Sequence, residues 1–157
     1  VKNNFSDSPN RNVSNGLFLM SRYQDGDTLY YAGVRVDGTA IIKKKYKGVY
    51  FTLSQKELFP GTYSDWRGDS NFLPHYEWVS LRFDTRSIAS NEVSLVFYYQ
   101  NPESGEWEKI IEVIDGGQFG ETPAIMEEGF AGIRTDFMDV RFENYRLQTL
   151  IRKAALF

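Results

Sequence analysis

Tyrosines and basic residues recur on neighbouring segments of this chain in a pattern that suits the recognition of sugars. The segments 29–36 and 39–46 together hold three tyrosines and four basic residues, and Arg22 and Arg134 lie in other segments of strand character. Tyrosine rings present flat apolar faces to the C–H side of a sugar, and Lys and Arg donate hydrogen bonds to hydroxyl or carboxylate oxygens. The alternative interpretation is a solvated basic strand that protects a sheet edge. The candidate ligand-binding residues are Arg22, Tyr31, Arg35, Lys44 and Arg134.

His75 is the only histidine of the chain, so any imidazole that binds a ligand or acts as a general base must be this one. It lies in the irregular segment 54–76, which is too long for a plain connection and is expected to form a structured or functional surface loop. A histidine in such a loop can equally serve the structure alone. We therefore treat His75 as a candidate ligand-binding and catalytic residue, with a structural role as the alternative.

Two pairs of aspartates lie in predicted loops near the ends of strands. Asp25 and Asp27 flank a glycine, and Asp136 and Asp139 follow the predicted strand 129–135. Carboxylate oxygens are ligands that Ca²⁺ prefers, so the four residues are candidates for a structural calcium site. Asp25 and Asp27 equally suit the formation of a turn. No cofactor is expected to be required.

The elements that must position these residues are predicted to be strands. Asp-Gly and Lys-Gly turns at 37–38 and 47–48 separate segments rich in aromatic and β-branched residues, which indicates two successive hairpins. If the first turn has two residues, Tyr31 and Arg35 share one face with Lys44. A shift of one residue would exchange the two faces.

About nine short segments of strand character follow one another along the chain, and helical periodicity is almost absent. This pattern predicts an all-β, antiparallel two-sheet sandwich or jelly roll. Residues 85–92 are expected to turn the chain, and the spacing of apolar residues in 148–157 suits a short amphipathic helix. The predicted strands are 16–23, 29–36, 39–46, 49–53, 79–83, 93–100, 107–114, 129–135 and 138–147.

Length and composition limit the class of protein. The 157 residues suit one domain, and a net charge of −3 argues against nucleic acid as a partner. No apolar run is long enough for a transmembrane helix. The absence of cysteine excludes disulfides, cysteine zinc sites and a thiol nucleophile. Because the chain starts at Val1, we expect it to be a piece of a longer protein, whose other domains or chains would be its partners.

Three stretches of the sequence together resemble a known family. They are RYQDGDTLYYAGVRVDGTAIIKKKYKGVYFTL, WVSLR from Trp78, and GFAGIRTDFMDVRFENYRL from Gly129. They resemble the concanavalin A-like lectin/glucanase superfamily, and within it the laminin G-like jelly-roll domains of microbial polysaccharide-acting proteins. The resemblance covers roughly residues 16–147. It implies a concanavalin A-like jelly roll over 1–147 that lacks its first strand or two, a tail over 148–157, and an extracellular or periplasmic location.

The resemblance also implies carbohydrate chemistry, of which three kinds stay open. The favoured hypothesis is a non-catalytic, lectin-like module of a larger polysaccharide-processing protein that binds a poly- or oligosaccharide in a groove lined by Tyr, Lys and Arg. The second is an enzyme acting on an acidic polysaccharide, with His75 and Tyr98 as catalytic candidates. The run Glu-x-Asp-x-x-Glu of jelly-roll glucanases is absent, which favours a polysaccharide lyase over a glycoside hydrolase. The third is a structural or assembly domain. Domains of this family often bind a structural calcium.

Overall fold

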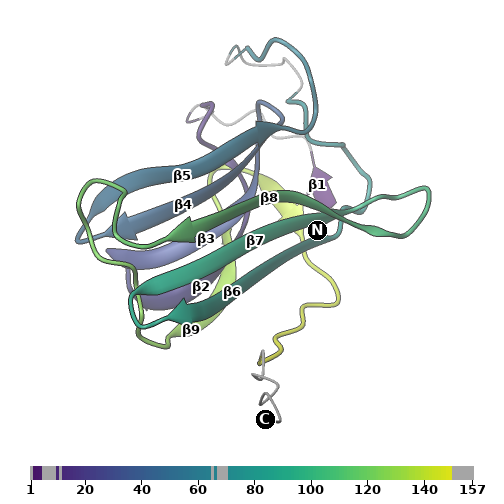
Figure 1. Cartoon of the computed structure of the whole chain (residues 1–157). Coiled ribbons are helices and arrows are strands. Elements are labelled where there is room, and N and C mark those ends of the chain that lie inside the picture. The colour runs from purple at the N-terminus through teal and green to yellow at the C-terminus, as the bar shows by residue number, and fades with distance from the viewer. Residues whose placement is uncertain (1, 5–9, 11, 65, 67–70, 150–157) are drawn as a thin grey trace.

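Two antiparallel sheets, packed face to face, account for most of the strands in this computed structural model, which describes residues 2–4, 10, 12–64, 66 and 71–149. Figure 1 shows the two sheets as separate layers. Helices are absent from this described part of the chain. The predicted fold class, an all-β antiparallel two-sheet sandwich of jelly-roll type, is therefore confirmed.

The larger sheet has five strands in the order β5-β4-β3-β2-β9, and the smaller has three in the order β6-β7-β8. Consecutive strands pair as hairpins within each sheet, and β9 returns to pair with β2. A third, two-stranded sheet consists of β1 and β10. The bounds are β1 Lys2–Asn4, β2 Gly16–Asp25, β3 Thr28–Arg35, β4 Thr39–Tyr46, β5 Val49–Glu57, β6 Leu81–Ala89, β7 Glu92–Gln100, β8 Trp107–Asp115, β9 Phe130–Thr135 and β10 Asp139–Arg141.

The hydrophobic core lies between the two main sheets because successive side chains of a strand point to opposite faces. On β3, Ala32 and Val34 point inward and are at most 1% exposed. On β7, Leu95 and Phe97 complete the core from the smaller sheet and have no exposed surface. The alternate residues of β3, such as Tyr31, consequently lie on the outer face of the larger sheet.

The turn between β3 and β4 has three residues, 36–38, instead of the predicted two. The Asp37 carboxylate accepts the Thr39 N–H at 3.0 Å, and Gly38 adopts a φ of 82°. A three-residue hairpin loop commonly ends on a residue in this left-handed conformation, which glycine adopts at low cost. The Asp-Gly pair therefore predicts the position of this hairpin correctly but does not specify the number of residues in its turn.

The extra turn residue shifts the pairing of the two strands by one position. Ala32 pairs with Ile42 and Tyr31 pairs with Lys43. The prediction that Tyr31 shares a face with Lys44 is therefore wrong, because a one-residue shift moves every side chain of a strand to the other face. Lys44 points into the core, and Lys43 lies beside Tyr31 on the outer face.

The later strands differ from the prediction mainly at their ends. β6 continues to Ala89, through most of the predicted turn 85–92, and the chain turns at Ser90 and Asn91. β6 lies at the edge of its sheet and contains several polar residues. The polar sequence of its second half was therefore interpreted as a turn. β10 is only three residues long. Most of the predicted helix, residues 150–157, lies outside the described residues.

Candidate functional site

Lys44 lies on the inner face of β4, where an ammonium group needs partners. Lys44 and Asp115 have no exposed side-chain surface, and Nζ donates to Asp115 Oδ2 at 2.7 Å. Nζ also donates to the carbonyls of Thr122 at 3.1 Å and Pro123 at 3.3 Å, so each of its three protons has an acceptor. Proteins tolerate a buried charge when it is paired and hydrogen-bonded in this way. Lys44 therefore joins the two sheets and does not face the outer surface.

Tyr30 and Arg22 form hydrogen bonds that connect the segment after β8 to the larger sheet. The Tyr30 hydroxyl donates to Asp115 Oδ2 at 2.6 Å and accepts the Ile125 N–H at 2.9 Å. Burial and the hydrogen bond to Asp115 raise the pKa of Tyr30 well above its ordinary value. Arg22 donates to the Ile125 carbonyl at 2.6 Å and to Ser87 Oγ at 2.8 Å. Arg22, like Lys44, thus holds the sandwich together.

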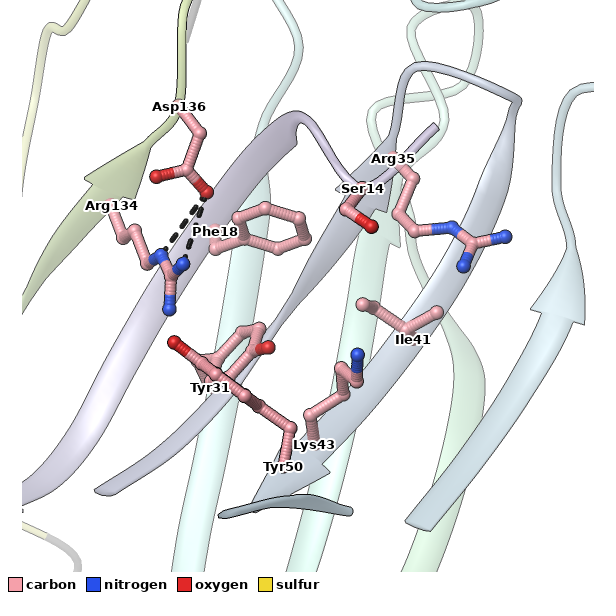
Figure 2. A pocket seen from close by; sticks show the side chains of 9 residues that line it. All are labelled: Ser14, Phe18, Tyr31, Arg35, Ile41, Lys43, Tyr50, Arg134 and Asp136. Atoms are coloured by element: carbon pink, nitrogen blue, oxygen red, sulfur yellow. Dashed lines mark hydrogen bonds and ion pairs between the residues drawn. The ribbon is translucent and has the colours of Figure 1, made fainter. Parts of the chain in front are cut away.

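A hollow of about 250 Å³ lies on the outer face of the larger sheet (Figure 2). The register arranges outward-facing residues of adjacent strands in rows across the sheet. One row runs from Lys43 through Tyr31 to Met20, and the next pairs Phe18 of β2 with Arg134 of β9. The hollow is lined by Ser14, Phe18, Tyr31, Arg35, Ile41, Lys43, Tyr50, Arg134 and Asp136.

Aromatic rings form one side of the hollow. Phe18 and Tyr31 meet edge to face with centroids 5.4 Å apart, and Tyr31 meets Tyr50 in the same way at 6.3 Å. Phe18 and Tyr31 are buried, and burial raises the pKa of Tyr31 to about 12. Tyr50 is 46% exposed, so it is the ring that a ligand can reach.

Three cationic side chains surround these rings. Arg35 is held by Asp37, to which its Nε donates at 3.2 Å, and Arg134 is held by Asp136 at 3.2 Å. Lys43 has no carboxylate partner in the described part of the chain. Burial, together with the positive charges of Arg35 and Arg134, lowers the pKa of Lys43. Three cations against two carboxylates leave the hollow with a net positive charge.

The pKa of Tyr50 responds to the same positive surroundings. Burial alone would raise it, but the hydrogen bond with Arg134 and the charges of Arg134 and Lys45 outweigh burial, so this pKa lies below its ordinary value. The Lys45 ammonium lies 4.9 Å from the centroid of the Tyr50 ring. An acceptor group placed against Tyr50 therefore meets an electropositive environment.

The structure brings three of the predicted ligand-binding residues, Tyr31, Arg35 and Arg134, to this hollow. Sequence interpretation missed Lys43 because a two-residue turn places it on the other face. A three-residue turn, the next most common hairpin connection, would have brought it beside Tyr31. Tyr50 was missed although its neighbour on β5, Phe51, is an apolar residue that packs partly buried against the core.

The catalytic candidates His75 and Tyr98 contribute nothing to the lining of the hollow. Tyr98 lies between two core residues of β7 and therefore faces outward from the smaller sheet, where the Arg82 guanidinium lies 4.9 Å from its ring. His75 lies between β5 and β6, beside Tyr76, with ring centroids 6.4 Å apart. The hollow thus has neither an imidazole nor Tyr98 for acid–base chemistry.

Three of the aspartates considered as calcium ligands make other contacts. Asp25 Oδ1 accepts the Asp27 N–H at 2.8 Å, as in an Asx turn, and Asp27 pairs with Lys45 at 2.8 Å. Asp136 holds Arg134. Within residues 2–4, 10, 12–64, 66 and 71–149, no three His, Cys, Asp or Glu side chains are grouped closely enough to hold a metal ion.

No protein-family model, curated protein sequence or solved structure matches this chain. In the described ranges, no helix has the length and apolar character that a membrane crossing requires. The fold and the hollow are therefore the basis of the functional proposal.

Proposed function

We propose that this protein is a carbohydrate-binding module that holds part of a sugar chain in the hollow on the larger sheet. The observation that carries the proposal is an exposed tyrosine ring, Tyr50, surrounded by the donors Lys43, Arg35 and Arg134. A sugar ring has an apolar C–H face that packs on an aromatic ring and hydroxyls that accept hydrogen bonds at its edge. The hollow offers both kinds of contact in one place.

The size and rigidity of the hollow support the same function. Its volume of about 250 Å³ lies just below the range of roughly 300–1,000 Å³ that is usual for enclosed small-molecule sites, so it suits one unit of a longer chain. Phe18 and Tyr31 are fixed by packing, and both arginines are held by carboxylates. A site whose side chains are already ordered loses little conformational entropy when a ligand binds.

We favour binding over catalysis because the described residues that line the hollow provide no acid–base pair. Asp136 is the one carboxylate among them, and this residue already pairs with Arg134. The fold alone does not decide between these classes, since sandwiches of this kind host many functions. A role as one part of a larger, extracellular polysaccharide-processing protein belongs to the same proposal.

The test is a screen of the purified chain on a glycan array, followed by affinity electrophoresis in gels that contain the polysaccharides that bind. Tyr50→Ala should weaken binding about tenfold or more, since it removes the exposed ring. Tyr98→Ala is the matched control, because it removes the same side chain from the outer face of the other sheet. Tyr98→Ala should bind as the wild type does.

Two results would overturn the proposal. One is the absence of binding to every glycan class on the array, and the other is Tyr50→Ala binding as tightly as the wild type. The same samples should show no rise in the ultraviolet absorbance of unsaturated uronates during incubation with acidic polysaccharides. A rise that tracks protein concentration would replace the binding module with a lyase.

A further inference from the structure

We propose that the hollow selects an acidic sugar, one that bears a carboxylate or a sulfate group, and that Lys43 binds the anionic group with Arg134 as a second donor. This inference rests on the carbohydrate-binding function proposed above and specifies the chemistry of its ligand. The same donors can bind the hydroxyls of a neutral sugar. The arrangement of charges in the hollow favours an anion over such a ligand.

The first support is the charge that is left unbalanced. Asp37 and Asp136 each neutralise one arginine, and in the described chain no carboxylate lies against Lys43. The Lys43 ammonium is partly buried and lies within the field of Arg35 and Arg134, which together make its charged form less favourable. An anion bound beside Lys43 would relieve this repulsion. A cation in these surroundings therefore favours a negatively charged ligand over a neutral one.

The second support is the direction of the donors. In Figure 2 the Lys43 ammonium points into the hollow, between Arg134 on one side and Arg35 on the other. Asp136 contacts Nε and one terminal nitrogen of Arg134. The other terminal nitrogen carries two protons, so it keeps a donor for a further acceptor even where the Tyr50 hydroxyl accepts one. Figure 2 shows that nitrogen directed toward the tyrosines. An anionic group above the Tyr50 ring can thus accept from both Lys43 and Arg134.

The third support is the contrast between the hollow and the whole chain. The protein carries a net charge of −3, which opposes the long-range attraction of nucleic acids and other dense polyanions. The positive charge of the hollow acts over a short range and adjoins an exposed aromatic ring. A ligand that combines a flat apolar face with a single anionic group, as an acidic sugar unit does, fits both features.

The test is isothermal titration of the full chain with oligosaccharides of equal length in three series: polyuronate, sulfated and neutral. Lys43→Gln removes the charge, Lys43→Arg retains it, and Lys109→Gln is the matched control on the smaller sheet, where Lys109 pairs with Glu112 at the surface. We expect one acidic series to bind at least tenfold more tightly than the neutral one. Lys43→Gln should weaken that binding about 10-fold to 100-fold, and Lys43→Arg should retain most of it.

The outcomes separate this inference from the proposed function. If the neutral and acidic series bind equally and Tyr50→Ala still weakens both, the acidic ligand is refuted and the binding module stands. If no series binds, the proposed function fails and the inference with it. Poly-glutamate that binds as tightly as the acidic sugars would overturn the inference by showing a general anion site. Melting curves of both Lys43 variants establish that they are folded, and Lys109→Gln should match the wild type throughout.

Discussion

Asp115→Ala should damage this fold strongly, because the Asp115 carboxylate is shared by two buried donors. Asp115 accepts hydrogen bonds from the Lys44 ammonium at 2.7 Å and from the Tyr30 hydroxyl at 2.6 Å, and all three side chains lie inside the sandwich. Without the carboxylate, the ammonium keeps only its two carbonyl acceptors and loses its counter-charge. Removing one partner of a buried ion pair leaves an uncompensated charge, which costs about 3–5 kcal/mol.

A loss of that size is a large share of the total stability. Domains are stable by about 5–15 kcal/mol, and for a chain of this length each kcal/mol shifts the melting temperature by about 2–4 °C. Asp115→Ala should therefore lower the melting temperature by about 6–20 °C. The double variant Lys44→Met/Asp115→Leu removes both charges and should recover most of the loss. The double variant still leaves the buried Tyr30 hydroxyl without its carboxylate acceptor, which costs about 1–3 kcal/mol of stability.

Equilibrium unfolding in urea at pH 7, followed by circular dichroism, measures these differences. Glu112→Ala is the matched control on the same strand, because it breaks a surface pair with Lys109 in which both side chains are about half exposed. Surface pairs of this kind contribute little to stability, so this variant should unfold with the wild type. The reasoning is refuted if Asp115→Ala costs no more than Glu112→Ala, or if the double variant is less stable than Asp115→Ala alone.

The remaining predictions concern the β3–β4 turn and the buried tyrosines. Gly38→Ala should lower the free energy of unfolding by about 1–3 kcal/mol in urea titrations, because φ is +82° and a Cβ would lie 1.9 Å from the Phe59 carbonyl oxygen. Gly26→Ala is the control and should be tolerated, because no atom lies within 4 Å of the added Cβ. Equal losses of stability in the two variants would contradict this explanation. Burial raises the pKa of Tyr31 to about 12 and that of Tyr30 further, from an ordinary value of 10.0, so the folded state resists deprotonation more than the unfolded chain does. The stability that the two neutral tyrosines contribute is fully present below pH 10 and is lost as the pH rises toward 12. Melting temperatures measured from pH 8 to 12 should fall over that interval, less steeply in Tyr31→Phe, and an identical slope in that variant would argue against a buried phenol at this position.

The strands and the fold class were predictable because they depend on patterns within each segment. Alternating aromatic and β-branched residues place β3 and β4 within a residue or so of their observed bounds. The site was predictable only in part. Tyr31, Arg35 and Arg134 line the hollow, but Arg22 points inward to a carbonyl 103 residues away in the sequence. No local pattern reports a partner at that separation.

Lys44 shows most clearly why the register could not be read from β4 alone. The alternate residues of β4 form two sets, one with Ala40, Ile42 and Lys44, and the other with Ile41 and two further lysines. Both sets mix apolar and basic residues, so hydrophobicity does not decide which one faces the core. Burying the Lys44 set is favourable only because Asp115, 71 residues further along, provides the counter-charge from the other sheet. The same choice turns Lys43 outward into the hollow, so the ion pair inside the sandwich determines which lysine a ligand can meet.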